Sequence, residues 1–130
     1  MNEAGGMRTI LLIEDDRFLR KAAEAALRRR GFAVLTAPDG VEGLRLARAQ
    51  HPDLVLLDLI MPGMQGFEVL KLLKADADTT AIPVVVLSNL GQDTDVQQAM
   101  TEGAVDYWIK ANLRLDQLVE RVTALCAAVR

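Results

Sequence analysis

The feature that most constrains the fold is a regular alternation of short apolar runs with longer stretches of helical periodicity. The runs are continuous rather than interrupted by polar residues, which is typical of strands covered on both faces in a parallel sheet. They occupy residues 10–13, 33–35, 54–57, 84–87 and 107–109. A helical pattern follows each run, so the chain repeats a strand and a helix five times.

Five such repeats predict a doubly wound α/β domain, with a five-stranded parallel sheet and five flanking helices. One common strand order for this size is 2-1-3-4-5, with a topological switch between the first and third strands. Ligands of such sheets bind at that switch, beyond the carboxyl ends of the strands. The apolar faces of the first two helices are predicted from Phe18, Ala22, Ala26 and Leu27 and from Val41, Leu44 and Ala47.

Composition narrows the classes of partner. The 130 residues fit one domain, and a net charge of -3 with 4% aromatic residues gives no basic footprint for nucleic acid. The run of arginines at 28–30 is interpreted as complementing the dipole of the first helix, which ends at Gly31. No apolar run is long enough to cross a membrane and no signal peptide is visible, so we expect a cytoplasmic protein.

Three further features are interpreted as structural rather than functional. Residues 1–6 are small and polar and are expected to form a flexible tail before a domain of residues 7–130. Cys126 is the only cysteine, which excludes an intrachain disulfide, and its apolar neighbours favour packing over reactivity. His51 has no nearby Cys or His and is interpreted as a solvated loop residue, not a metal ligand.

Polar residues follow four of the apolar runs, at the edge of the sheet where a ligand is expected. Acidic residues 14–16 follow the first strand, Asp58 the third, Ser88 the fourth and Lys110 the fifth. Carboxylates crowded at one edge repel one another and favour a hard divalent cation such as Mg²⁺ or Mn²⁺. Acidic residues also cap helices, and Asp16 is expected to do so, but capping does not explain Asp58 or Lys110. The set therefore points to a metal-assisted phosphoryl site.

The sequence resembles the receiver domains of response regulators in two-component signal transduction, over essentially all of residues 7–130. Each matching stretch is weak evidence alone, but all four in this order and at the family's spacing are highly specific. The resemblance implies a flavodoxin-like fold and a phosphorylation-controlled signalling switch. The matching stretches are ILLIEDD at 10–16, LLDLIMPGMQG at 56–66, PVVVLS at 83–88 and GAVDYWIK at 103–110.

The resemblance assigns the phosphoryl chemistry and the switch to four side chains. It implies that Asp58 accepts a phosphoryl group from a sensor histidine kinase or a histidine phosphotransfer protein, and that Lys110 pairs with the phosphoryl oxygens. Ser88 matches the switch hydroxyl. Tyr107 matches the aromatic residue whose rotamer follows phosphorylation, although ordinary packing on an edge strand remains the alternative for it. A cation and a lysine beside the acceptor would offset the charge that builds on the transferred group.

The resemblance also implies a Mg²⁺ site, or a Mn²⁺ site. Asp15 matches the direct carboxylate ligand, and Glu14 matches the acidic residue that acts through water. Asp58 contributes its own carboxylate, and the backbone carbonyl of Ile60 falls where the family supplies another ligand.

Two apolar residues lead to a prediction about the lifetime of the signal. Hydrolysis of a phosphorylated Asp58 needs a water in line with the phosphorus. Ile60 and Leu90, two residues beyond Asp58 and Ser88, are expected to flank that approach, and neither can orient a water. We therefore predict a long-lived phosphorylated state, against the alternative that both residues only cover the rim.

Two residues depart from the family's pattern. Ala111 follows Lys110, where proline is usual and its peptide bond is often cis. A cis bond before a residue other than proline costs about 2.5–4 kcal/mol, so this loop is expected to differ in shape. Asn89 stands where the family usually has a small residue. Both departures concern the detailed geometry and the amplitude of switching, and not the chemistry.

Three functions are compatible with a phosphoryl site of this kind. The first is a signalling switch that is not a turnover enzyme, has no DNA-binding domain of its own, and can pair as a homodimer through the face of helix 4, strand 5 and helix 5. The second is a phosphatase with an aspartyl nucleophile, which would place a second Asp where Ile60 stands. The third is a degenerate receiver used only for binding. The sequence names neither the cognate kinase nor the output partner.

Overall fold

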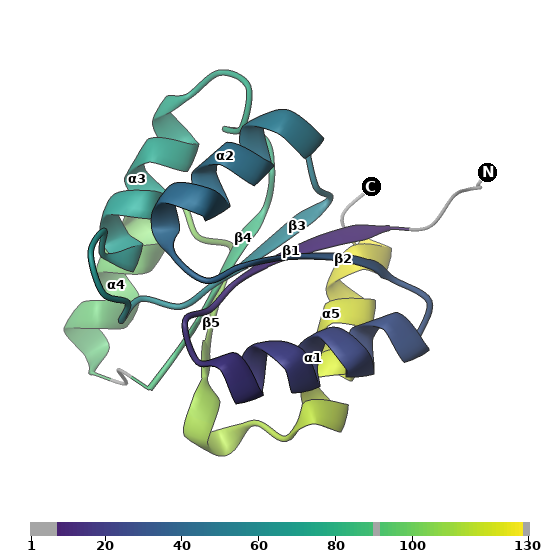
Figure 1. Cartoon of the computed structure of the whole chain (residues 1–130). Coiled ribbons are helices and arrows are strands. Elements are labelled where there is room, and N and C mark those ends of the chain that lie inside the picture. Colours follow the sequence, from purple (N-terminus) through teal and green to yellow (C-terminus); the bar gives the residue numbers. More distant parts are fainter. Residues whose placement is uncertain (1–7, 90–91, 129–130) are drawn as a thin grey trace.

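The computed structural model describes residues 8–89 and 92–128, and within them strands and helices alternate as predicted (Figure 1). The expected tail at residues 1–6 and Leu90 lie outside the described residues. The strands are β1 (Thr9–Ile13), β2 (Ala33–Ala37), β3 (Leu54–Leu57), β4 (Val84–Ser88) and β5 (Asp106–Ile109). The helices are α1 (Arg17–Arg29), α2 (Gly40–Gln50), α3 (Gly66–Ala75), α4 (Asp93–Thr101) and α5 (Leu115–Ala128).

The sheet has the predicted order β2-β1-β3-β4-β5, and all neighbouring strands are parallel. The register brings the carboxyl ends together, because Ile13 at the end of β1 pairs with both Ala37 of β2 and Leu57 of β3. On the other side, Ser88 at the end of β4 pairs with Ile109 at the end of β5. The residues that follow these positions therefore share one edge of the sheet.

Helices cover both faces of the sheet and enclose two apolar cores (Figure 1). Side chains from α1 and α5 pack on one face, and side chains from α2, α3 and α4 pack on the other. Strands β1, β3 and β4 contribute to both cores because successive side chains point to opposite faces. This burial on both faces explains why the runs at 10–13, 54–57 and 84–87 are continuously apolar.

Side-chain caps begin two of the helices. The Asp16 carboxylate accepts a hydrogen bond from the Leu19 N–H at 3.1 Å and caps α1, as expected. The Asp39 carboxylate accepts from the Glu42 N–H at 2.9 Å and caps α2 in the same way. The exposed His51 ends α2 in the left-handed conformation, with φ of 47°, a role that the sequence did not reveal.

Two residues assigned to apolar helix faces are in fact exposed, and the prediction was wrong for them. Phe18 is 90% exposed and Val41 is 66% exposed. Ala23 and Leu27 define the buried face of α1, and Phe18 lies about 140° around the helix from Ala23 at 3.6 residues per turn. Both exposed residues lie in the first turn of their helices, at the carboxyl edge of the sheet. Leu44, like Ala47, is buried as expected.

The isolated residues behave largely as the sequence indicated. Cys126 is buried, and its burial raises the pKa of the thiol, as expected of a packing residue. Arg28 pairs with Glu24 at 3.0 Å and donates to the Val34 carbonyl at 2.9 Å, so it serves the helix locally. Within the described ranges, none of the helices is both long and apolar enough for a membrane span.

Candidate metal centre and phosphoacceptor site

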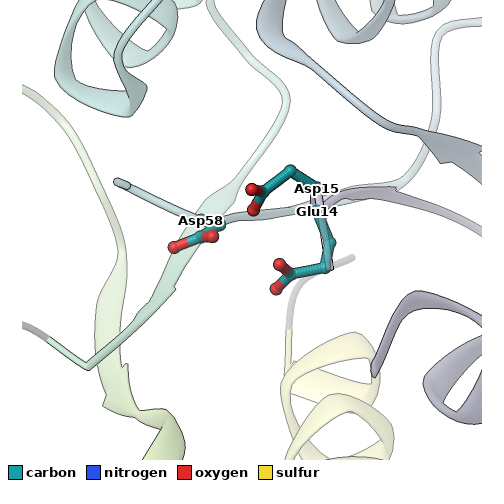
Figure 2. A group of neighbouring side chains, drawn as sticks. All are labelled: Glu14, Asp15 and Asp58. Atoms are coloured by element: carbon teal, nitrogen blue, oxygen red, sulfur yellow. The ribbon is translucent and has the colours of Figure 1, made fainter. Parts of the chain in front are cut away.

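Three carboxylates converge at the carboxyl ends of β1 and β3. Oxygens of Glu14, Asp15 and Asp58 all lie within 4.8 Å of one another. Figure 2 shows the first two leaving the end of β1 with their carboxylates on the Asp58 side. Glu14 and Asp58 are 1% and 4% exposed, whereas Asp15 is open to solvent. The topology has therefore assembled the acidic set that the sequence predicted.

Lys110 contacts two of these carboxylates from the end of β5. Its Nζ lies 2.6 Å from Glu14 Oε1 and 3.1 Å from Asp58 Oδ2, and its side chain is only 15% exposed. The residue opens a single 3-10 turn, Lys110–Asn112, in the loop where Ala111 replaces the usual proline. The predicted lysine thus reaches the acceptor carboxylate across β4.

Burial dominates the proton affinities of the site. Desolvation raises the pKa of Glu14 from 4.5 to about 7, against hydrogen bonds from Lys110 and the Asp16 N–H that lower it. Desolvation also raises the pKa of Asp58, although the charge of Lys110 opposes the shift. For Lys110, burial lowers the pKa, but hydrogen bonding to Glu14 and attraction to Asp58 outweigh it and leave the pKa raised. Glu14 and Asp58 are shielded from water, so a positive partner nearby favours their ionised forms.

The donor set fits a hard divalent cation. Three carboxylates face one ammonium, which leaves two negative charges uncompensated when all are ionised. Glu14 Oε1 is buried and, apart from the Lys110 ammonium, has no hydrogen-bond donor in good geometry among the described residues. Mg²⁺ prefers one or two carboxylates and keeps several waters, and exposed Asp15 leaves room for them. Asp15 and Asp58 would hold the ion, with Glu14 beside it.

Backbone contacts fix the acceptor loop. The Asp58 N–H donates to the Ile13 carbonyl at 3.0 Å, and the Ile60 N–H donates to Asp58 Oδ1 at 3.1 Å. Gly66 starts α3 against this loop, and a Cβ there would lie only 2.4 Å from the Asp58 carbonyl oxygen. Sequence reasoning treated Gly66 only as the start of a helix, because a close backbone approach leaves no local signal.

Arg20 also belongs to the site, and sequence reasoning missed it. Its Nη1 donates to the Glu14 carbonyl at 2.9 Å and to the Asp15 carbonyl at 3.3 Å, so one guanidinium holds both residues of the acidic turn. The signal that could have revealed it is its place in the first turn of α1, which contains no acidic residue. Cations are unfavourable at a helix N-terminus unless another contact holds them.

The two switch residues lie together on the β4–β5 side. Ser88 is fully buried at the end of β4, and its side chain shares a hydrogen bond with half-buried Tyr107. Desolvation raises the pKa of the Tyr107 phenol despite this bond, and the nearby charges of Asp95 and Asp58 add to the rise. The structure therefore brings the predicted hydroxyl and aromatic residue into contact, within the electrostatic range of Asp58.

Of the two residues assigned to phosphoryl lifetime, only one is described. The Ile60 side chain is 55% exposed on the rim of the site, directly after the loop that holds Asp58. Leu90 lies outside the described residues. The backbone carbonyl of Ile60 as a metal ligand, and both residues as barriers to water, stay predictions.

The chain is similar to known proteins over most of its length. The family profile described as the response regulator receiver domain matches residues 10–123. The chain is 39% identical to PilH of Pseudomonas aeruginosa over 80% of its own length and 86% of that protein. It is 42% identical to the transcriptional regulatory protein AfsQ1 of Streptomyces coelicolor, of which it spans only 45%.

Solved structures agree with the fold. Vibrio cholerae chemotaxis protein CheY4 superposes with a TM-score of 0.85 at 25% identity, covering 92% of this chain and 98% of that one. The Francisella response regulator 1452 receiver domain gives 0.85 at 26% identity, covering 95% and 99%. With the five-stranded order, the converging carboxylates and the family match all on one chain, this protein belongs to the response regulator receiver domain family.

Proposed function

We propose that the protein accepts a phosphoryl group on Asp58 from a phosphorylated histidine of a partner protein and acts as a signalling switch. The observation that carries this proposal is the Asp58 carboxylate, 4% exposed, with Lys110 Nζ 3.1 Å from one oxygen and two more carboxylates within 4.8 Å. A buried nucleophile between a cation and a metal-binding pair suits transfer of a highly charged group.

In the proposed reaction, an Asp58 oxygen forms a bond to phosphorus while the phosphorus–nitrogen bond to the donor imidazole breaks, and the bonding electrons stay on that nitrogen. The Lys110 ammonium would move from Glu14 toward the transferred oxygens and stabilise their charge. A bound Mg²⁺ supplies further charge stabilisation and a template for the phosphoryl oxygens. The Ile60 N–H orients the acceptor by its bond to Oδ1.

The switch would act through Ser88 and Tyr107. A phosphoryl group on Asp58 offers strong acceptors for the Ser88 hydroxyl and thereby weakens its bond to the Tyr107 phenol. Helix α4 lies beside β5 and buries only Ala99 among its described residues. A small change in the bond between Ser88 and Tyr107 would therefore suffice to shift this helix. The proposed homodimer would use this same side, where Met100 and Val105 expose 44% and 43% of their area.

The donor protein would dock over the open edge of the site and along α1. Phe18 is 90% exposed at the start of this helix, and Leu115, at the start of α5, is 37% exposed. Arg17, Lys21 and Arg29 are exposed on the same side of α1 as Phe18 and have no hydrogen bond or ion pair to any described residue. An apolar side chain flanked by unpaired cations suits a helical partner with acidic residues around an apolar centre.

Turnover of small phosphate esters is not part of the proposal. The second acid of an aspartyl phosphatase would stand where the Ile60 side chain lies, and Ile60 offers no proton. Several relatives are named as transcriptional regulators and are about twice as long as the matched segment. Action without a DNA-binding domain therefore stays a prediction, and so does the downstream effect of the whole protein.

The test of the proposed acceptor is the intact mass after incubation with acetyl phosphate, with and without Mg²⁺. One added phosphoryl group that requires Mg²⁺ is expected for the wild type and for Phe18→Ala, because a small donor needs no docking surface. Asp58→Asn should take up none. Uptake by Asp58→Asn equal to that of the wild type would place the acceptor elsewhere.

Docking along α1 needs a protein donor. Transfer from a phosphorylated histidine phosphotransfer domain should be slower to Phe18→Ala than to the wild type, with unchanged uptake from acetyl phosphate. Val41→Ala is the matched control, since Val41 is a similarly exposed apolar residue in the first turn of α2. Equal slowing by both substitutions would argue against a specific surface on α1.

A further inference from the structure

The turn between β1 and α1 leaves the sheet with two backbone carbonyls that the ladder does not use. The Glu14 N–H still donates to the Ala37 carbonyl at 2.9 Å, and the Ile13 carbonyl accepts from the Asp58 N–H at 3.0 Å. Beyond these bonds the chain departs from both neighbouring strands. The carbonyls of Glu14 and Asp15 are therefore left for another donor, and the Glu14 carbonyl is partly shielded from solvent.

Arg20 is that donor. Its Nη1 lies 2.9 Å from the Glu14 carbonyl oxygen and 3.3 Å from the Asp15 carbonyl oxygen, and the side chain is half-buried against the turn. Both bonds come from one nitrogen, and a lysine ammonium on a shorter side chain is less suited to reach the same two acceptors. One arginine thus bridges two of the three residues whose carboxylates converge at the metal site.

The guanidinium contacts carbonyls and not carboxylates, although three acidic side chains lie close by. No ion pair joins Arg20 to Glu14, Asp15 or Asp16 among the described residues. The turn is therefore held in place without the Asp15 carboxylate being occupied. Its position in the first turn of α1 is unfavourable with respect to the helix dipole, which the contacts with the two carbonyls offset.

We propose that Arg20 is a positioning residue for the metal site, which keeps the Asp15 carboxylate aligned with Asp58 by bridging the Glu14 and Asp15 carbonyls. This inference rests on the proposed function, because it concerns the same Mg²⁺ site. Without the bridge, the turn gains freedom, and the cation has to order it on binding. Groups that orient metal ligands typically change metal affinity by about 10–100-fold when they are removed.

The sign of the effect separates positioning from simple electrostatics. Removing a positive charge near a cation site strengthens cation binding if charge alone matters. Removing a positioning contact weakens it. Arg20→Met keeps an unbranched apolar stem but has no donor, so positioning predicts weaker Mg²⁺ binding despite the lost charge. Arg17→Met, in the same helical turn and exposed, is the control, and should bind Mg²⁺ as well as the wild type or more tightly.

The experiment measures the Mg²⁺ dissociation constant by isothermal titration calorimetry for the wild type, Arg20→Met, Arg20→Lys and Arg17→Met, together with the phosphorylation rate from acetyl phosphate against Mg²⁺ concentration. We expect about a 10-fold weaker affinity for Arg20→Met, an intermediate value for Arg20→Lys, and a near-normal rate at saturating Mg²⁺.

Two outcomes would overturn the proposal. Unchanged or tighter Mg²⁺ binding by Arg20→Met would leave the residue no positioning role, and equal weakening by Arg17→Met would show a nonspecific effect. A failure of the proposed function looks different, because the wild type itself would then bind no Mg²⁺ and take up no phosphoryl group. Circular dichroism melts without metal establish that each variant is folded.

Discussion

The two sides of the site differ in how their functional residues are held. On the β1–β3 side, two backbone hydrogen bonds to neighbouring strands and the Arg20 bridge fix the acidic turn, and Gly66 lets α3 lie directly against the Asp58 loop. On the β4–β5 side, β5 pairs with β4, the Ser88 and Tyr107 side chains share a hydrogen bond, and the neighbouring α4 buries only Ala99 among its described residues. The acceptor and the acidic pair therefore lie on the β1–β3 side, whereas α4, with little apolar anchorage, lies beside the switch residues.

The largest expected effect concerns the acceptor. Asp58→Asn should remove phosphoryl uptake entirely, because the amide oxygen is a poor nucleophile. It should also raise the melting temperature of the metal-free protein, since it removes a buried charge whose pKa is raised by desolvation. Mass spectrometry and thermal melts check both. A lower melting temperature in Asp58→Asn would contradict the idea that the three carboxylates repel one another in the metal-free protein.

The second prediction concerns pH. Burial raises the pKa of Glu14 from 4.5 to about 7, so between these values the folded protein holds a proton that the unfolded chain has released. The free energy of unfolding should therefore fall as pH rises from 4.5 to about 7, by up to about 3 kcal/mol at about 1.4 kcal/mol per pKa unit. Urea unfolding without metal, at a series of pH values, measures this slope.

Two controls sharpen the pH prediction. Glu14→Gln should flatten the slope, because the amide does not titrate. Excess Mg²⁺ should also reduce it, because the cation favours the ionised carboxylate. A slope unchanged by Glu14→Gln would mean that another group carries the pH dependence and that Glu14 is less desolvated than its burial indicates.

The third prediction concerns the rim. Ile60→Asn should speed loss of the phosphoryl group from Asp58 several-fold, because an amide beside the acceptor can orient water where the exposed Ile60 cannot. The decay is followed by mass spectrometry after removal of the phosphodonor. Ile60→Val keeps the rim apolar and should decay like the wild type. Equal decay of Ile60→Asn and the wild type would show that water reaches the site by another path.

The smallest effect is expected at the switch. Tyr107→Phe removes the bond to Ser88 and should lower the free energy of unfolding by about 1 kcal/mol, the net value of a typical hydrogen bond. Phosphorylation by acetyl phosphate should change little, because Tyr107 is not among the residues expected to accept the phosphoryl group or hold the metal. A marked fall in the phosphorylation rate would show that the bond between Ser88 and Tyr107 also contributes to phosphoryl transfer.

Much of the fold could be predicted from the sequence because its signals are local. Continuous apolar runs at 10–13, 54–57 and 84–87 indicate strands buried on both faces, and their order with the helices limits the sheet to few topologies. Once the parallel order is known, Glu14, Asp15, Asp58 and Lys110 must meet at one edge. The structure shows the acidic set and its lysine side by side, as the sequence predicted, while their roles stay predictions.

The amino-acid sequence by itself determined the order of the elements, the edge of the sheet that carries the chemistry and the residue types found there. Only the tertiary structure decided that Phe18 is exposed, that Gly66 admits a backbone 2.4 Å from where its Cβ would be, and that Arg20 holds the acidic turn. The periodicity of apolar residues describes one helix by itself and does not show which of its turns lie over the sheet. A carbonyl that lacks a ladder partner becomes apparent only after the strands have paired, because every peptide unit carries the same donor and acceptor.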